Sequence, residues 1–188
     1  MIQHKQEAPI SRQYFGDVLT EPIGSAYTTI IATTETVLIP TAFTPINAME
    51  PRAGKVYELI VGGTVTTGTA GTLTITPRFG TTISGTGIGA SPVQNYVPSI
   101  TTAPFLFRYY LVIRSLGLTG ANSTVVGYGN WSSGGAIATA SSETAVDVGT
   151  VGAAVSVDTS IAQALWIGVT FSVAPSVIPN FHVWRSLN

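Results

Sequence analysis

Gly, Pro and β-branched residues recur so closely along this sequence that few windows are long enough for a helix. The 188 residues include 20 Gly and 11 Pro, and nearly every window of helical length contains one of them. Gly and Pro are unfavourable inside a helix, and Val, Ile and Thr lose side-chain freedom there. The same β-branched residues fit the pleated surface of a sheet. The sequence therefore predicts an all-β fold.

Runs of alternating side chains predict about eight strands within one domain. Strands at this spacing are typical of a double-sheet sandwich. Residues 25–188 are therefore expected to form an eight-stranded, jelly-roll-like β-sandwich. The nine candidate segments, from which these eight strands are expected, are Thr34–Pro40, Gly54–Thr66, Thr72–Phe79, Phe105–Leu116, Ser123–Ser132, Glu143–Val148, Ala153–Val157, Gln163–Val173 and Asn180–Leu187.

Turn residues join two pairs of these segments as expected hairpins. The turn Thr67–Gly71 follows the strand that begins at Gly54, and side chains alternate again from Leu73 to Phe79. The turn Gly117–Asn122 separates the segments on either side of it in the same way. Because tight turns connect antiparallel neighbours, each pair is predicted to lie in one sheet.

Two of the expected strands depart from a simple alternation of buried and exposed side chains. Gly62 and Gly63 permit a bulge or a bend inside the first long strand. The segment Phe105–Leu116 has large side chains on both faces. One face is expected in the core, and the other is expected to meet a neighbouring sheet, loop or subunit.

Residues 1–24 are expected to form an extended N-terminal arm. They carry five of the seventeen charged residues, show no sustained alternation, and contain Pro9 and Pro22, which favour extended backbone. An arm of this kind can become ordered on the surface of a partner. Arg12, Tyr14 and Phe15 are its candidate contact residues.

Three further contact candidates lie outside the arm. Residues 80–104 are rich in Gly, Ser, Thr and Pro and are expected to leave the sandwich as a contact loop, with Ile88 and Tyr96 as its contact residues. Trp131 completes the set as an aromatic residue that fits a core or a subunit interface.

The scarcity of charge limits the partners that this chain is expected to have. Charged residues make up 9% of the sequence, and the formal net charge is −1. Such a poorly charged surface suggests coverage by neighbouring subunits, including copies of the same chain. Nucleic acid is not expected as a partner, because clustered Lys and Arg are needed to neutralise phosphates. Membrane insertion is not expected either, because the longest apolar stretch is too short and is interrupted by polar residues.

The sequence contains no recognisable catalytic or metal-binding pattern, so neither an enzyme nor a cofactor is expected. There is no Cys, and the two His residues lack metal-ligand spacing. A hydrolase that uses His182 and a nearby acid is the weakest hypothesis, since a nucleophile motif is missing. His182 is instead expected to face solvent or an interface.

A second alternative is a site formed by the acidic residues Glu143, Asp147 and Asp158. They would form a carboxylate pair or a calcium site only if folding gathers them, and their spacing does not match a known calcium loop. The favoured interpretation is that these acids cap turns.

A third alternative is sugar binding by the tryptophans. Trp131, Trp166 and Trp184 would form a sugar-stacking platform if their rings were exposed. This makes a receptor- or carbohydrate-binding module the alternative function, with a glycan as its ligand. The favoured interpretation is that these rings fill a core or an interface.

Three stretches carry a family resemblance: Arg52–Tyr57 at the start of a long strand, the Thr/Gly-rich segment Thr69–Gly80, and Val155–Leu165 before the penultimate strand. Over about residues 35–187, the chain resembles jelly-roll and β-sandwich virion proteins of tailed bacteriophages, including tail and fibre components. The resemblance implies a capsid decoration or auxiliary subunit, made in the host cytoplasm and located on the virion surface. The implied partners are the major capsid protein and further copies of the chain, and the resemblance implies no catalytic residues.

Overall fold

Side chains alternate between buried and exposed along the long strands of the computed structural model. The structure describes residues 19–21, 29–40, 44–82, 84–89, 93–117, 122–134, 137–138, 145–149 and 154–188. Within these ranges there is no helix, so the all-β prediction is confirmed. The long strands are β4 (Val56–Thr67), β5 (Gly71–Gly80), β8 (Ile100–Ser115), β9 (Ser123–Ser133), β13 (Gln163–Phe171) and β14 (Ser176–Ser186).

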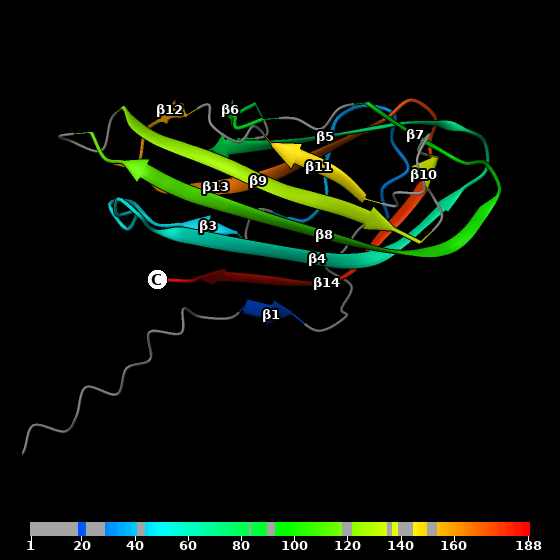
Figure 1. Ribbon diagram of the computed structural model, residues 1–188, viewed down its shortest axis with the longest axis horizontal. Helices are drawn as coiled ribbons and strands as arrows, with labels where there is room; N and C mark the ends of the chain where they lie inside the picture. Colours follow the sequence, from blue (N-terminus) through cyan, green and yellow to red (C-terminus); the bar gives the residue numbers. More distant parts are fainter. Residues whose placement is uncertain are drawn as a thin grey trace, which may run out of the picture.

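The strands form two antiparallel sheets. The short strands are β1 (Leu19–Glu21), β2 (Thr36–Val37), β3 (Pro45–Ile46), β6 (Thr86–Gly87), β7 (Gln94–Tyr96), β10 (Ile137–Ala138), β11 (Ala145–Gly149) and β12 (Val155–Val157). Sheet A has the order β1-β14-β4-β8-β9-β11, with β12 also beside β9. Sheet B has the order β10-β7-β5-β13-β2, with β3 beside β13 and β6 beside β5. Figure 1 shows sheet A from β1 upward through β14, β4, β8 and β9, with β5 and β13 passing behind.

The core lies between the two sheets and is rich in aromatic rings. Phe105, Phe107 and Tyr109 alternate along β8, and all three are buried. The ring of Phe105 stacks on that of Trp131, with a centroid distance of 4.2 Å. Each such side chain contributes about 1.5–3 kcal/mol by leaving water. The two inner faces together therefore make this a β-sandwich, as the sequence predicts.

Of the two predicted hairpins, the one formed by β8 and β9 is confirmed. Phe105 lies opposite Ser133, and the pairing continues to Ser115 opposite Thr124. The predicted hairpin between β4 and β5 is wrong, because β4 belongs to sheet A and β5 to sheet B. Both edges of β4 are already occupied, by β14 and β8, so the chain crosses to the other sheet and β5 pairs with β13.

A bulge in β14 lies opposite the two glycines of β4. Pro179 pairs with Gly63 and Phe181 pairs with Gly62, so Asn180 is an extra residue in β14. The predicted irregularity at the glycine pair is therefore present, with the additional residue in the partner strand. A Cβ at Gly62 would clash with Cε1 of Phe181, because the Phe181 ring covers the bare backbone of this glycine.

The bulge exchanges the two faces of β14. One extra residue turns every later side chain to the opposite side of the sheet. Val177 is buried before the bulge, whereas His182 and Trp184 are buried after it. Phe181 and Arg185 consequently lie on the outer side of sheet A, although Phe181 would have faced the core in an unbroken alternation.

The prediction for residues 80–104 is only partly correct. This segment contains β6 and β7, and β8 already begins at Ile100. Ile88 and Tyr96 are buried rather than displayed in a contact loop. Each anchors a hydrogen bond, since Tyr109 Oη donates to Ile88 O at 3.2 Å and Tyr96 Oη donates to Val173 O at 2.8 Å.

The predicted arm overlaps the sandwich at one point. Leu19–Glu21 pair with β14, where Leu19 lies opposite Trp184 and Glu21 lies opposite His182. These three residues are therefore a strand of sheet A, because the edge of β14 provides them with backbone partners. Residues 1–18 and 22–28 lie outside the described part of the chain.

Candidate functional site

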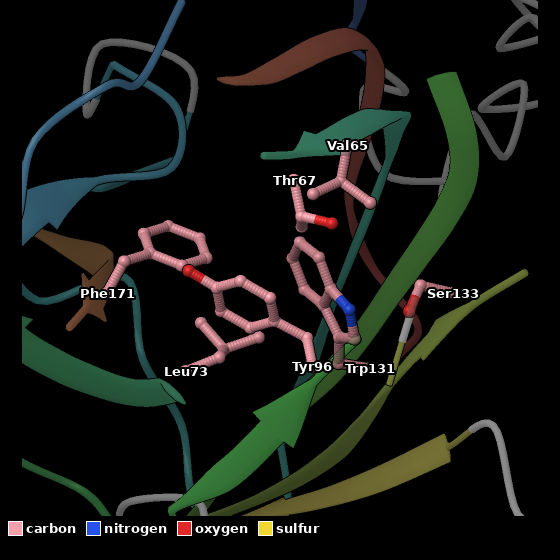
Figure 2. Close-up of a pocket in the computed structure, with 7 residues that line it drawn as sticks. All are labelled: Val65, Thr67, Leu73, Tyr96, Trp131, Ser133 and Phe171. Atoms are coloured by element: carbon pink, nitrogen blue, oxygen red, sulfur yellow. The ribbon is translucent and has the colours of Figure 1, made fainter. Parts of the chain in front are cut away.

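A small cavity lies among core side chains of the sandwich (Figure 2). It has a volume of about 10 Å³ and is lined by Val65, Thr67, Leu73, Tyr96, Trp131, Ser133 and Phe171. Figure 2 shows the ring of Tyr96 between those of Phe171 and Trp131. A space of this size holds at most one water molecule. It is therefore too small for an organic ligand.

Ser133 is an unusual member of this lining. Its Oγ is buried and has no hydrogen-bond partner among the described residues. A buried hydroxyl without a partner costs about 1–3 kcal/mol. The cavity is thus a weak point of the core rather than a ligand site.

The structure does not present Ile88, Tyr96 and Trp131 as contact residues. Their side chains are only 1%, 5% and 1% exposed, respectively. All three point into the interior of this chain, because they lie at core-facing positions of the sandwich. We therefore withdraw them as contact candidates. Arg12, Tyr14 and Phe15 lie outside the described residues.

His182 is fully buried, so its predicted position facing solvent or an interface is wrong. The bulge that precedes it turns its side chain to the core side of β14. A side chain in this position does not meet a substrate, which removes the geometric basis for a hydrolase that uses His182.

Asp158 caps a turn, as the favoured interpretation of the acids expects. Its Oδ1 accepts hydrogen bonds from Ser160 Oγ at 2.5 Å and from Ser160 N at 2.8 Å. These two bonds hold the pKa of Asp158 below its ordinary value. The described residues contain no group of three potential metal ligands. Glu143 and the side chain of Asp147 lie outside the described part.

The three tryptophans do not form a common platform. Trp131 and Trp184 are buried, and Trp184 stacks on Tyr57 with a centroid distance of 5.3 Å. Trp166 is half-buried on the outer side of sheet B, opposite Arg78 in the adjacent strand. Its indole N–H donates to Gly80 O at 2.9 Å.

The outer side of sheet A, which is turned away from sheet B, carries a group of exposed apolar side chains. We call this side the outer face. Leu106 is 40% exposed, Tyr128 46%, Ile178 38% and Phe181 42%. These side chains come from β8, β9 and β14, and nothing in the described chain covers them. Exposed apolar side chains gathered on one side of a domain are typical of an interaction surface.

A buried carboxylate lies at the centre of the outer face. Glu58 is only 2% exposed, although it points away from the core. Its Oε2 accepts from Arg185 Nη2 at 2.5 Å and from Arg185 Nε at 2.6 Å. Arg108 Nε lies farther away, 3.7 Å from Oε1. Arg185 lies directly opposite Glu58 in the register of β14 and β4, which explains this geometry.

Tyr110 forms the other flank of Glu58. It lies opposite Glu58 on β8 and stacks on Tyr128 with a centroid distance of 5.1 Å. Burial, followed by the hydrogen bond to Glu58 and the charge of that carboxylate, raises the pKa of Tyr110. The phenol of Tyr110 therefore stays protonated beside the Glu58 carboxylate. Arg185, Glu58, Tyr110 and Tyr128 form one continuous row across four strands.

The accessible charge of the outer face is positive. Arg108, Arg114 and Arg185 all lie on it, and the only acidic side chain described there is the buried Glu58. Arg108 and Arg185 keep 47% and 42% of their side-chain surface exposed. Since the whole chain has only eight Lys and Arg, this concentration on one sheet face is notable.

The sequence alone does not predict this cluster. Alternation from Val56 to Ile60 puts Glu58 on one face of the strand but indicates no partner for it. Arg185 is 127 residues away in the chain, so no local pattern connects the two. The available signal was that Glu58 interrupts an apolar strand in a chain with few charges.

The chain is therefore a β-sandwich protein with an exposed, apolar and arginine-bearing outer face. Comparison with protein-family models, with curated proteins and with solved structures finds no match. Among the described residues, no helix is long and apolar enough to cross a membrane.

Ser133→Ala is expected to raise the free energy of unfolding by about 1 kcal/mol, because it removes a buried hydroxyl that lacks a partner. The matched control is Ser123→Ala at the other end of β9, where Ser123 Oγ and Thr159 Oγ1 are hydrogen-bonded at 2.8 Å. That change is expected to lower the same quantity by about 1 kcal/mol. Urea unfolding measures both. Equal losses at the two positions would mean that Ser133 has a partner, such as a water in the cavity.

Arg185→Met is expected to lower the free energy of unfolding by about 2 kcal/mol, because it leaves the buried Glu58 with the more distant Arg108 alone. Arg114→Met removes the same charge from the same face, and Arg114 has no ion pair among the described residues. We expect this control to cost about 0.5 kcal/mol or less. Similar effects of the two changes in urea unfolding would contradict a structural role for the Glu58 ion pair.

Proposed function

We propose that this chain is a structural subunit of a tailed-bacteriophage particle, namely a decoration or auxiliary subunit that binds the head lattice. The observation that carries the proposal is the order of the strands. The double-sheet jelly roll recurs in viral capsid domains, as it does in lectins.

The pairing of eight of the strands supports a jelly-roll order. Taken along the chain as first to eighth, they are β1, β2, β4, β5, β7, β8, β13 and β14. Sheet A contains β1, β14, β4 and β8 side by side, which are the first, eighth, third and sixth of these strands. Sheet B contains β2, β13, β5 and β7, which are the second, seventh, fourth and fifth. This order supports two interlocked Greek keys, with β9 and β11 added at one edge of sheet A.

The surface of the chain supports assembly with other proteins. Charged residues are few, and the outer face exposes apolar side chains that a solitary protein would benefit from covering. Coverage by a lattice accounts for both. The major capsid protein and further copies of this chain are the partners that we propose, at the capsid surface.

The N-terminal segment is the proposed lattice attachment. It precedes β1 at the edge of sheet A, and Arg12, Tyr14 and Phe15 remain its candidate contacts. A segment with mixed charges and aromatic residues can add backbone hydrogen bonds and buried area when it becomes ordered on a partner.

A carbohydrate-binding module of a tail or fibre is the second candidate function, and one observation favours it. The half-buried Trp166 lies beside a paired Arg78 and Glu35, with Arg78 Nε 2.8 Å from Oε1 and Nη2 2.9 Å from Oε2. An indole next to a fixed polar pair suits sugar stacking combined with hydrogen bonding. Glycan-array binding that Trp166→Ala abolishes would favour this function over lattice attachment.

Deletion of residues 1–18 is expected to abolish binding to phage heads that have been stripped of this protein. The deletion leaves β1 in place, so cooperative unfolding should be retained. Co-sedimentation with heads from a phage that encodes the chain measures binding, and electron cryomicroscopy of the intact particle locates the subunit.

The matched control carries residues 1–18 in scrambled order, with the same length and charge. It is expected to lose binding as well. Full binding by the deletion variant would remove the proposed attachment, and absence of the chain from the particle would remove the proposed function.

A further inference from the structure

We propose that the outer face of sheet A docks an acidic, apolar segment of another protein, with Arg108 holding a carboxylate and Leu106 and Phe181 receiving an apolar side chain. This inference specifies the chemistry of a partner and depends on the proposed function only for the identity of that partner.

Arg108 is the charged group that is free to bind. Arg185 is committed to Glu58 through two short contacts, whereas Arg108 only approaches this carboxylate, at 3.7 Å. The side chain of Arg108 makes no hydrogen bond within the described part of the chain, and 47% of it is exposed. A guanidinium with most of its donors unused is suited to bidentate recognition of a carboxylate.

Leu106 and Phe181 provide the apolar part of the site. Both lie in the same row across the sheet, on either side of Gly62, whose missing side chain allows the Phe181 ring to lie over the strand. Leu106 and Arg108 project from the same face of β8, two residues or about 7 Å apart. An extended partner segment with an acidic and an apolar residue at alternate positions has the same spacing.

Neighbouring rings reinforce this site. Tyr110 and Tyr128 stack on each other next to Arg108, and Tyr128 is 46% exposed. Tyr and Arg are the side chains that most often dominate binding energy at protein interfaces. Their packing against one another also reduces the entropy that binding would cost.

The positive charge of the outer face favours an acidic partner. Among the side chains that the structure describes, three Arg lie on the outer face, and the buried Glu58 is the only acid there. Two copies meeting through this same face would place like charges together, which is unfavourable. An acidic surface of a different protein is complementary, so we assign the outer face to such a partner.

The test uses a short synthetic peptide in which Glu and Leu alternate. Calorimetry with the full chain is expected to detect binding. Arg108→Glu is expected to weaken it by at least about tenfold, the factor that corresponds to about 1.4 kcal/mol. Leu106→Ser is expected to weaken it several-fold. Arg108→Gln removes the charge without reversing it and should have an intermediate effect.

Matched controls lie elsewhere on the chain. Arg52→Glu makes the same charge change at an exposed residue outside the outer face, and Ile161→Ser replaces another exposed apolar side chain. Both should bind the peptide like the unaltered chain. A peptide with Lys in place of Glu, and one with Ser in place of Leu, should both bind poorly.

Several outcomes would overturn the inference. They are no binding of the Glu-Leu peptide, equal binding of the Lys-Leu peptide, and Arg108→Glu binding as well as Arg52→Glu. Light scattering that shows an oligomer lost in Leu106→Ser would assign the face to a second copy instead. Binding to anionic phosphatidylserine vesicles, without peptide binding, would assign it to a membrane surface. The particle experiments can fail while this peptide test succeeds, and the reverse, so the two proposals are separable.

Discussion

The extra residue in β14 determines what both sides of sheet A display. Because the pairing shifts between Pro179 and Phe181, His182 and Trp184 enter the core while Phe181 and Arg185 turn outward. The glycines of β4 make this shift tolerable, since the bare backbone of Gly62 accepts the Phe181 ring. Without the shift, the Glu58 carboxylate would not meet Arg185, and a buried charge would lack its closest counterion.

Local patterns were enough to predict the six long strands, but not the short strands β6 and β7 or all of the strand partners. The alternation in β8 and the tight connection to β9 predicted that hairpin correctly, because both signals lie within a few residues. The same logic failed for β4 and β5, where a turn of similar composition carries the chain from one sheet to the other. Pairing over long separations is decided by which strand edges are still vacant, and a sequence does not display that directly.

The candidate interaction surface was harder to predict than the fold. The large residues on both sides of β8 predict that one of its faces meets a neighbour. Leu106 lies on that face and is exposed in the described chain. The pairing of Glu58 with Arg185 depends on a register set by the bulge, so inspection of either strand alone does not reveal it. Ile88, Tyr96 and Trp131 were misassigned because their hydrophobic character suits a core and an interface equally well.

The separation between β4 and β14 along the chain has a consequence for synthesis. Glu58 and Arg185 are 127 residues apart, and closing so long a loop is slow. Since translation proceeds from the N-terminus, Glu58 and Gly62 emerge from the ribosome well before residues 176–186 are made. The outer face is thus completed late, and a nascent chain has no finished surface with which to engage a partner prematurely.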